Sequence, residues 1–226
     1  MFWQVLGDIL PLAFGIIISP MPIAAVIALL LGPKGKLNAV AFTIAFVMAT
    51  FAVTLIFASG TKGTTQSDSF FAQLFHIVIG FAFAALFFFL AWRSFTNRPK
   101  KGEKPHEPKW LAAIDSFGLV KSIGLALLLG TVNVKNLPIE IAAGATIGTA
   151  KLEWPLVFIA VLVFAVIGSL GIIVPTLIGA SGSKSVSSFL GNVKTALITH
   201  NNLIMAVLFV ILGAVQLGKA IGSFGG

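Results

Sequence analysis

The sequence predicts an all-α membrane protein with six transmembrane helices, arranged as two inverted three-helix repeats. Three observations predict this fold: an apolar composition, six long apolar runs and a short motif that recurs in both halves. Of the 226 residues, 58% are hydrophobic and 10% are charged, and the mean hydropathy is +1.04. A soluble chain needs a polar surface, whereas a chain in lipid is apolar both outside and between its helices. The composition therefore predicts that the chain is embedded in a lipid bilayer.

Six apolar runs are long enough to cross about 30 Å of hydrocarbon, which takes about 20 helical residues. They cover residues 4–31, 37–59, 70–95, 117–148, 152–180 and 197–221. No Lys or Arg precedes the first run, and Asp8 lies inside it, so we expect a retained helix rather than a signal peptide. The predicted domains are a first repeat (1–92), a basic linker with an interfacial segment (93–116) and a second repeat (117–226).

Lysine and arginine in the short loops predict the orientation. With the N-terminus outside, eleven of these residues lie on the cytoplasmic side and three lie outside. We therefore expect a multi-pass protein of the bacterial inner membrane, with both termini outside and the linker 93–110 in the cytoplasm. The formal net charge of +8 is then a topology signal, and no nucleic-acid partner is expected.

A short motif recurs in the two halves. Residues 19–32 read SPMPIAAVIALLLG and residues 135–148 read KNLPIEIAAGATIG, so that Pro22 matches Pro138 and Gly32 matches Gly148 at one offset. Because three helices make up each half, the second half enters the membrane from the opposite side. Inverted repeats of this kind are typical of secondary transporters.

The prolines of this motif predict a break in the first and fourth helices. A proline inside a helix removes a backbone donor and leaves the preceding carbonyls without partners. We expect one break around Ser19, Pro20 and Pro22 and the other before Pro138, both inside the membrane and facing each other. Each break would create a half-helix N-terminus with free N–H groups that attract an anion, with Ser19, Asn133 and Asn136 as caps. Ordinary proline kinks are the alternative interpretation.

Lys135 and Glu140 are the charged side chains predicted deep in the apolar core, where an unpaired charge is costly. They form either a structural ion pair or a functional site. In a functional site, Glu140 would serve in proton coupling or cation binding, and Lys135 would meet a substrate anion or act as the counter-charge. The complete predicted substrate and coupling-ion site is Ser19, Pro20, Pro22, Asn133, Lys135, Asn136, Pro138 and Glu140. The polar residues Thr43, Thr50, Thr54, Ser169 and Thr176 are expected to bond to their own helix backbones.

No catalytic, metal or cofactor site is predicted. Cysteine is absent, and the three histidines are scattered along the chain. The sequence contains neither a nucleophile and base in a recognisable catalytic spacing nor a nucleotide-binding loop. The protein is therefore not expected to be an enzyme, and transport would draw on an ion gradient or on the gradient of the substrate.

Four features resemble one known family. They are SPMP in the first helix, GPKGKLNAVAF before the second, the basic linker, and VNVKNLPIEIAAG in the fourth helix. Together they are similar to the glycopeptidolipid-addressing and sulfolipid-addressing proteins of the lysine-exporter superfamily, over nearly the whole chain. The family pattern Asn-Pro-Lys-Asn maps onto residues 133–136 and departs at Val134, so the break relies on Pro138 instead. The resemblance implies six helices, homodimers, and movement of polar lipids or their precursors to the envelope of bacteria with complex envelope lipids.

The expected function is therefore export of a polar lipid or lipid-linked envelope precursor by a transporter or flippase. Alternating access coupled to protons or ions would drive it, with membrane lipids and an amphiphilic or polar small molecule as partners. Two alternatives stay open: an exporter of amino acids or small ions, and a non-transporting membrane adaptor of a lipid-export machine. Deleting residues 93–109 would abolish an adaptor but only weaken a transporter.

Overall fold

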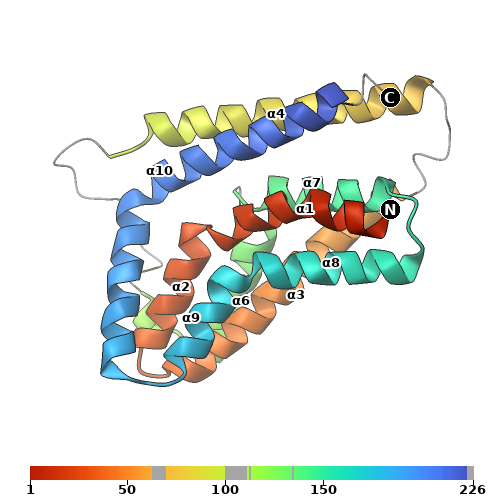
Figure 1. Ribbon diagram of the computed structural model, residues 1–226. Coiled ribbons are helices and arrows are strands. Elements are labelled where there is room, and N and C mark those ends of the chain that lie inside the picture. Colours follow the sequence, from red (N-terminus) through yellow and green to blue (C-terminus); the bar gives the residue numbers. More distant parts are fainter. Residues whose placement is uncertain (63–69, 100–110, 112, 134, 223–226) are drawn as a thin grey trace.

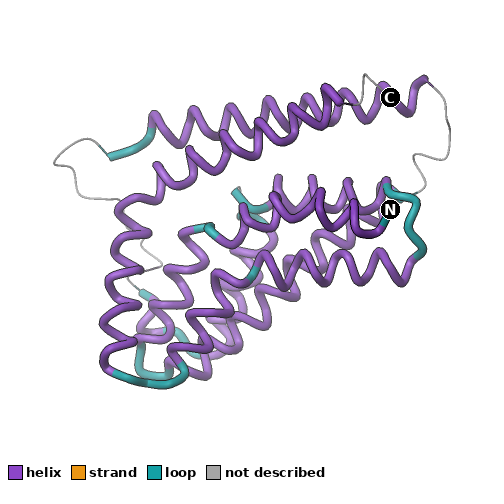
Figure 2. Tube along the Cα trace, viewed as in Figure 1, coloured by secondary structure: helices purple, strands orange, loops and turns teal. Residues whose placement is uncertain are grey.

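The described part of the chain consists of helices and short connections (Figure 2). A computed structural model describes residues 1–62, 70–99, 111, 113–133 and 135–222, and gives the backbone alone for residues 70–76 and 115. The helices are α1 (Phe2–Ile17), α2 (Pro20–Leu31), α3 (Gly35–Thr61), α4 (Phe70–Thr96), the 3-10 turn η1 (Ile114–Ser116), α6 (Leu119–Thr131), α7 (Leu137–Thr149), α8 (Trp154–Gly168), α9 (Leu170–Gly179) and α10 (Lys184–Gly222). The all-α prediction is confirmed within these ranges.

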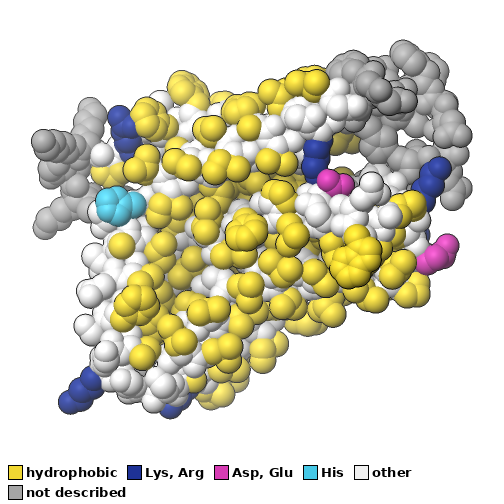
Figure 3. All heavy atoms as spheres, viewed as in Figure 1, with side chains coloured by type: hydrophobic (Ala, Val, Ile, Leu, Met, Phe, Trp, Pro, Cys, Tyr) yellow, Lys and Arg dark blue, Asp and Glu magenta, His cyan; other side chains and the backbone are white. Residues whose placement is uncertain are grey.

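Three helices are long and apolar enough to cross a membrane: α3, the stretch Ile77–Thr96 of α4, and α10. Two bent pairs, α1 with α2 and α8 with α9, raise the number of candidate spans to five. The predicted span 117–148 consists of two helices of 13 residues each, α6 and α7, which a five-residue connection separates. On the face drawn in Figure 3, hydrophobic side chains cover most of the surface and charged ones are few. The chain is therefore a multi-pass helical membrane protein.

Both breaks predicted from the prolines are present. α1 ends at Ile17, and α2 begins at Pro20 after a bend of 52°. α6 ends at Thr131, and α7 begins at Leu137 with Pro138 in its first turn. A proline in the first turn loses no intrahelical bond, because the N–H at that position has no partner inside the helix. Each proline therefore starts a new helix instead of kinking the old one.

A third bend lies where the sequence predicted one continuous helix, 152–180. α8 and α9 meet at Ser169 with an angle of 56°. Gly168 and Ser169 form the kind of small, polar pair at which helices bend, and Pro175 removes another backbone donor six residues beyond the joint. A Cβ at Gly171 would overlap the carbonyl oxygen of Ile17, so this bend fits directly against the end of α1.

Glycines hold two pairs of spans together in parallel. Along the first pair, α8–α9 meets α1–α2 at Gly168 with Ile16, Gly171 with Ile17, and Gly179 with Leu30. Along the second pair, α6–α7 meets α3 at Gly130 with Ala49, Gly144 with Phe57, and Gly148 with Ala58. In both pairs the residue numbers rise together, so the partners run in the same direction. Small residues allow this close approach between helices in a membrane.

α4 and α10 form a separate antiparallel pair. Phe87 stacks on Phe209 with ring centroids 6.1 Å apart, and Gly80 lies beside Ala220. α10 bends, so that its first part lies beside α2 and its second part runs along α4 (Figure 1). It begins at Lys184 rather than near residue 197, because the polar stretch 184–196 has an apolar side, which buries Leu190 next to Gly179. Among the described elements, α4 packs extensively against α10 alone.

Candidate functional site at the helix breaks

The two proline breaks lie against each other, as the sequence predicted. A Cβ added at Gly15 would lie 2.9 Å from Cδ1 of Ile139. Gly15 is one turn before Ser19, and Ile139 follows Asn136 closely at the start of α7. The packing of α1 on α7 therefore brings the residues at the two breaks together in the interior.

Buried polar side chains gather at these breaks without hydrogen-bond partners among the described residues. Ser19, Thr50, Asn136 and Glu140 are all buried, and the hydroxyl, amide and carboxylate atoms of the four have no partner. We call these four residues the break cluster. Leaving a buried donor or acceptor without a partner costs about 1–3 kcal/mol. The fold therefore keeps, at its centre, hydrogen-bonding capacity that its own side chains do not use.

Glu140 is the charged member of the break cluster, and its side chain is 0% exposed. It lies one turn before Gly144, the residue whose missing side chain lets α7 approach α3 at Thr54. The Thr50 hydroxyl, one turn earlier on α3, faces the carboxylate. Neither carboxylate oxygen completes a hydrogen bond in good geometry, and no described cation pairs with it. A proton or a cation would satisfy this carboxylate.

The capping at the breaks differs from the prediction. Ser19 and Asn136 occupy the N-cap positions of α2 and α7 but make no side-chain cap hydrogen bond. The N–H groups of Ile139 and Glu140 donate to the Asn136 carbonyl at 2.9 and 3.0 Å, so the predicted free donors near Ile139 are absent. Asn133 does not cap α7 either, because its Oδ1 accepts the N–H of Lys135 at 3.1 Å within the connection before the helix.

Lys135 and Glu140 do not pair. Its Nζ donates to Oδ1 of Asn201 on α10 at 3.2 Å. Asn201 in turn donates to Oδ1 of Asn202 at 3.0 Å, and Asn202 donates to the backbone carbonyl of Asn97 just after α4. We call Asn97, Asn201 and Asn202 the asparagine chain. Its hydrogen bonds connect the second break to the surface of the α4–α10 pair. In the sequence, the polar triplet His200-Asn201-Asn202 was the signal for these polar contacts.

Of the five hydroxyl residues expected to bond to their own helices, Thr176 alone does so, and Thr43 bonds to Thr176 instead. Thr50, Thr54 and Ser169 are buried without a partner, so the expectation is wrong for them. Thr176 does bond to the carbonyl of Ile172 at 2.9 Å, and its hydroxyl also lies 2.7 Å from that of Thr43 on α3. Ser169 ends α8 beside the first break, so it adds a further unsatisfied hydroxyl near the break cluster.

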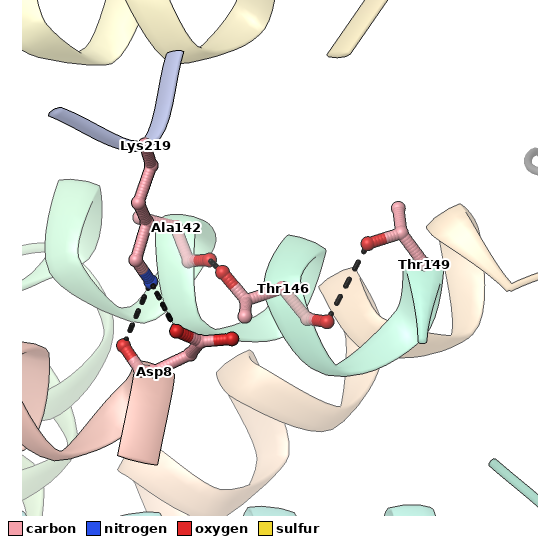
Figure 4. A network of polar contacts seen from close by, with 5 residues as sticks. All are labelled: Asp8, Ala142, Thr146, Thr149 and Lys219. Carbon is pink, nitrogen blue, oxygen red and sulfur yellow. Dashed lines mark hydrogen bonds and ion pairs between the residues drawn. The ribbon is translucent and has the colours of Figure 1, made fainter. Parts of the chain in front are cut away.

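A cavity of about 200 Å³ separates the α4–α10 pair from α3 and α7. Its polar lining comes from Thr61, Thr146, Thr149, Gln216 and Lys219. Beside it, Nζ of Lys219 lies 3.6 Å from the Asp8 carboxylate and donates to the Asp8 carbonyl at 2.9 Å (Figure 4). Thr146 and Thr149 bond to carbonyls of their own helix. The ion pair between Asp8 and Lys219 joins α1 to the end of α10, and the sequence did not predict it.

Some predicted features lie outside the described residues. They are Val134, the linker residues 100–110, and the side chains of residues 70–76. Pro20 and Pro22 are buried in the first turn of α2. Pro138 is in the first turn of α7. The other predicted site residues separate into two groups: Ser19, Asn136 and Glu140 inside the break cluster, and Asn133 and Lys135 on the connection between α6 and α7.

The helices and the break cluster together define a multi-pass membrane protein with a buried polar site. The chain belongs to the family described as Sap, sulfolipid-1-addressing protein, whose family model matches residues 9–222. This match confirms the resemblance drawn from SPMP, the GPKGKLNAVAF segment and VNVKNLPIEIAAG. No curated protein and no solved structure matches the chain.

Proposed function

We propose that the protein carries a polar lipid or a lipid-linked envelope precursor across the bacterial inner membrane by alternating access around the break cluster. The observation that carries this proposal is the set of buried, unpartnered polar side chains where two broken helices meet. In transporters, broken helices at mid-membrane depth supply the substrate and ion sites. The description of the family, which names a sulfolipid, supports a lipid as the cargo.

The packing supports six spans in two inverted repeats, with α6–α7 as the fourth span. When the two halves are exchanged, α1–α2 corresponds to α6–α7, and α8–α9 corresponds to α3. The packing of α8–α9 on α1–α2 therefore corresponds to the packing of α3 on α6–α7. Both pairs are parallel and close-packed at glycines. The same exchange maps the antiparallel α4–α10 pair onto itself. Membership of the lysine-exporter superfamily is part of this proposal.

The α4–α10 pair is the element that moves in this mechanism. Because α4 packs extensively against α10 alone among the described elements, α4 and the second part of α10 can shift together while the first part of α10 keeps its contacts with α2. The cavity beside Lys219 lies along that boundary, at the end of the molecule where α1 begins and α10 ends (Figure 1). With both termini outside, as the basic loops favour, this cavity is the outward part of the pathway.

The two charged residues have separate roles in the proposal. Glu140 binds the coupling proton or cation, since its carboxylate is buried and unpaired. Lys135 presents a positive charge to an anionic headgroup from the connection between α6 and α7. Movement of an ion through Glu140, or the gradient of the lipid itself, supplies the energy. We propose no enzymatic step.

Leaflet-to-leaflet transfer in liposomes tests the proposal. The protein is reconstituted with trace fluorescent sulfatide, and dithionite reports the fraction of probe that has reached the outer leaflet. We expect the protein to accelerate transfer, and Asn136→Ala to slow it about tenfold, the effect of roughly 1.4 kcal/mol of lost transition-state stabilisation. Thr131→Val is the matched control, because the Thr131 hydroxyl bonds to its own helix at 2.7 Å.

Rates equal to those of protein-free liposomes, with and without a proton gradient, would overturn lipid transport. Uptake of labelled lysine by the same vesicles would then favour the amino-acid exporter. An equal loss of transfer rate in Thr131→Val and Asn136→Ala would show that any substitution near the connection between α6 and α7 slows transfer. The break cluster would then have no specific part in the mechanism.

A further inference from the structure

An apolar groove runs along the surface of the α4–α10 pair. It has a volume of about 480 Å³, and all nine residues that line it are apolar. They include Phe88, Trp92 and Phe95 on α4, and Leu203, Val207 and Ile211 on α10. This volume is within the usual range of ligand sites, and the lining has no polar group to orient a water-soluble ligand. The groove alone fits a hydrocarbon chain.

One end of the groove is cationic and polar. The guanidinium of Arg98 lies 3.7 Å from the ring centroid of Phe95, so a positive charge sits on the wall of the groove. Asn97 and Asn202 of the asparagine chain meet at the same end. Asn97 follows the last turn of α4, and Asn202 directly precedes the groove residue Leu203. An amphiphile with its chain in the groove would have its headgroup at this end.

The asparagine chain connects this end of the groove with the second break. Asn202 is one turn before Ala206, which lines the groove, whereas Asn201 is one turn before Met205, which is fully buried. The two asparagines therefore lie on different faces of α10, one toward the groove and one toward the interior. The hydrogen bond between them, and that from Lys135 to Asn201, make a continuous polar path inward.

We infer that the groove between α4 and α10 is the lateral site where the transported lipid enters, with an acyl chain in the groove and an anionic headgroup at Arg98 and the asparagine chain. This inference rests on the proposed function and specifies its substrate as an anionic amphiphile. From this position the headgroup moves along Asn202 and Asn201 to Lys135, while the chain stays in the bilayer.

Charge distinguishes this occupant from a second copy of the protein. A two-fold interface on the groove would place the Arg98 side chains of both protomers in one interface, because such a contact uses the same surface patch of each protomer. Like charges brought together in a low-dielectric interface are unfavourable. A sulfate or phosphate headgroup instead supplies the opposite charge.

Photocrosslinking in liposomes tests the inference. The probe is sulfatide with a diazirine in its acyl chain, and mass spectrometry maps the labelled peptides of the full-length protein. We expect labelling at the groove to be competed by unlabelled sulfatide but not by galactosylceramide, which differs from it only in lacking the sulfate. Val207→Trp, which fills the groove from a position 54% exposed, should reduce labelling about tenfold.

Two further variants separate the groove from general effects. Leu177→Trp places the same bulk at a site on α9 that is 69% exposed and outside the groove, and should leave labelling unchanged. Arg98→Gln should keep the labelling but remove the preference for sulfatide. Glu140→Gln should label like the parent even though its transport is lost.

Three outcomes would overturn the inference. Equal competition by galactosylceramide would mean that the groove holds ordinary bilayer lipid. Because the chain has no cysteine, a Val207→Cys variant that oxidises to a disulfide-linked dimer would identify a second copy as the occupant. If Val207→Trp transports sulfatide as fast as the parent, entry is elsewhere while lipid transport itself stands. If the labelling is selective for the sulfate but the protein transports no lipid, the lipid site in the groove stands and the proposed function is wrong.

Discussion

The two proline breaks match in sequence but differ in what surrounds them. The first is a connection of two residues, Ile18 and Ser19, without a charged side chain, and the bend at Ser169 packs tightly against it. The second spans residues 132–136 and carries Lys135, with Glu140 one turn beyond. Close backbone packing surrounds the first break, where the hydroxyls of Ser19 and Ser169 have no described partner, whereas the second break leaves an amide and a carboxylate, those of Asn136 and Glu140, unsatisfied. We therefore propose that the first break supports the structure and that the second serves transport.

Glu140 offers the strongest test of this division. Glu140→Gln keeps the shape of the side chain but removes the group that can bind a proton or a cation. We expect transport driven by a proton gradient to fall tenfold or more, which corresponds to roughly 1.4 kcal/mol or more. Glu140→Met should at the same time stabilise the protein by about 1–4 kcal/mol, since a buried charge is replaced by an apolar group of similar volume. Gradient-driven sulfatide transfer and thermal unfolding measure the two effects.

The matched control for Glu140 is Glu153→Gln. Glu153 is exposed at the N-cap of α8, so its loss should change neither transport nor stability appreciably. If Glu140→Gln retains the full dependence of transport on pH and gradient, Glu140 is not the coupling group. If Glu140→Met unfolds more easily than the parent, the carboxylate is structural and the second break resembles the first.

The breaks could be predicted from the sequence because their cause is local. Proline removes a donor wherever it occurs in a helix, and Pro22 and Pro138 stand at matching positions of the repeat. Apolar runs are also local signals, and the ends of the described helices match the ends of five of the six predicted runs to within a few residues, although α6 and α7 fill the fourth run as two short helices. The sixth, α10, begins early because the apolar side of its first turns is set by contact with α9.

The remainder of the candidate site depends on contacts between distant residues. Thr50 and Ser169 look like ordinary transmembrane hydroxyls, and only the packing of α3 and α8 shows that nothing described satisfies them. Asn201 and Lys135 are 66 residues apart, so no pattern along the chain connects them. The bend at Ser169 likewise follows from the shape of α1 against which Gly171 packs. Periodicity along one sequence contains no information on such pairs.

Gly171 tests whether tight packing maintains the first break. Gly171→Ala places a Cβ against the Ile17 carbonyl oxygen, which is backbone and cannot rotate away. We expect a loss of about 1–3 kcal/mol from overpacking, measured as a lower unfolding temperature in detergent by tryptophan fluorescence. Transport per folded protein should stay within about twofold, an effect below roughly 0.5 kcal/mol.

Gly124→Ala is the matched control, since no atom lies within 4 Å of the Cβ it would add. Alanine has the higher helix propensity, so this variant should unfold at the same temperature as the parent or slightly above it. Equal stability of Gly171→Ala and the parent would mean that α8 and α9 shift freely. The first break would then not depend on this packing.

Ser19 gives the smallest and most discriminating effect, because it is the one member of the break cluster on the first break. Its hydroxyl is buried and has no partner among the described residues, so Ser19→Ala removes a desolvated group without breaking a hydrogen bond. We expect stability to change by less than about 1 kcal/mol, in the favourable direction, and sulfatide transfer to match that of the parent. A clear loss of transport with unchanged stability would show that Ser19 touches the substrate. Both breaks would then form one shared binding site, and the difference between them would lie only in their charge.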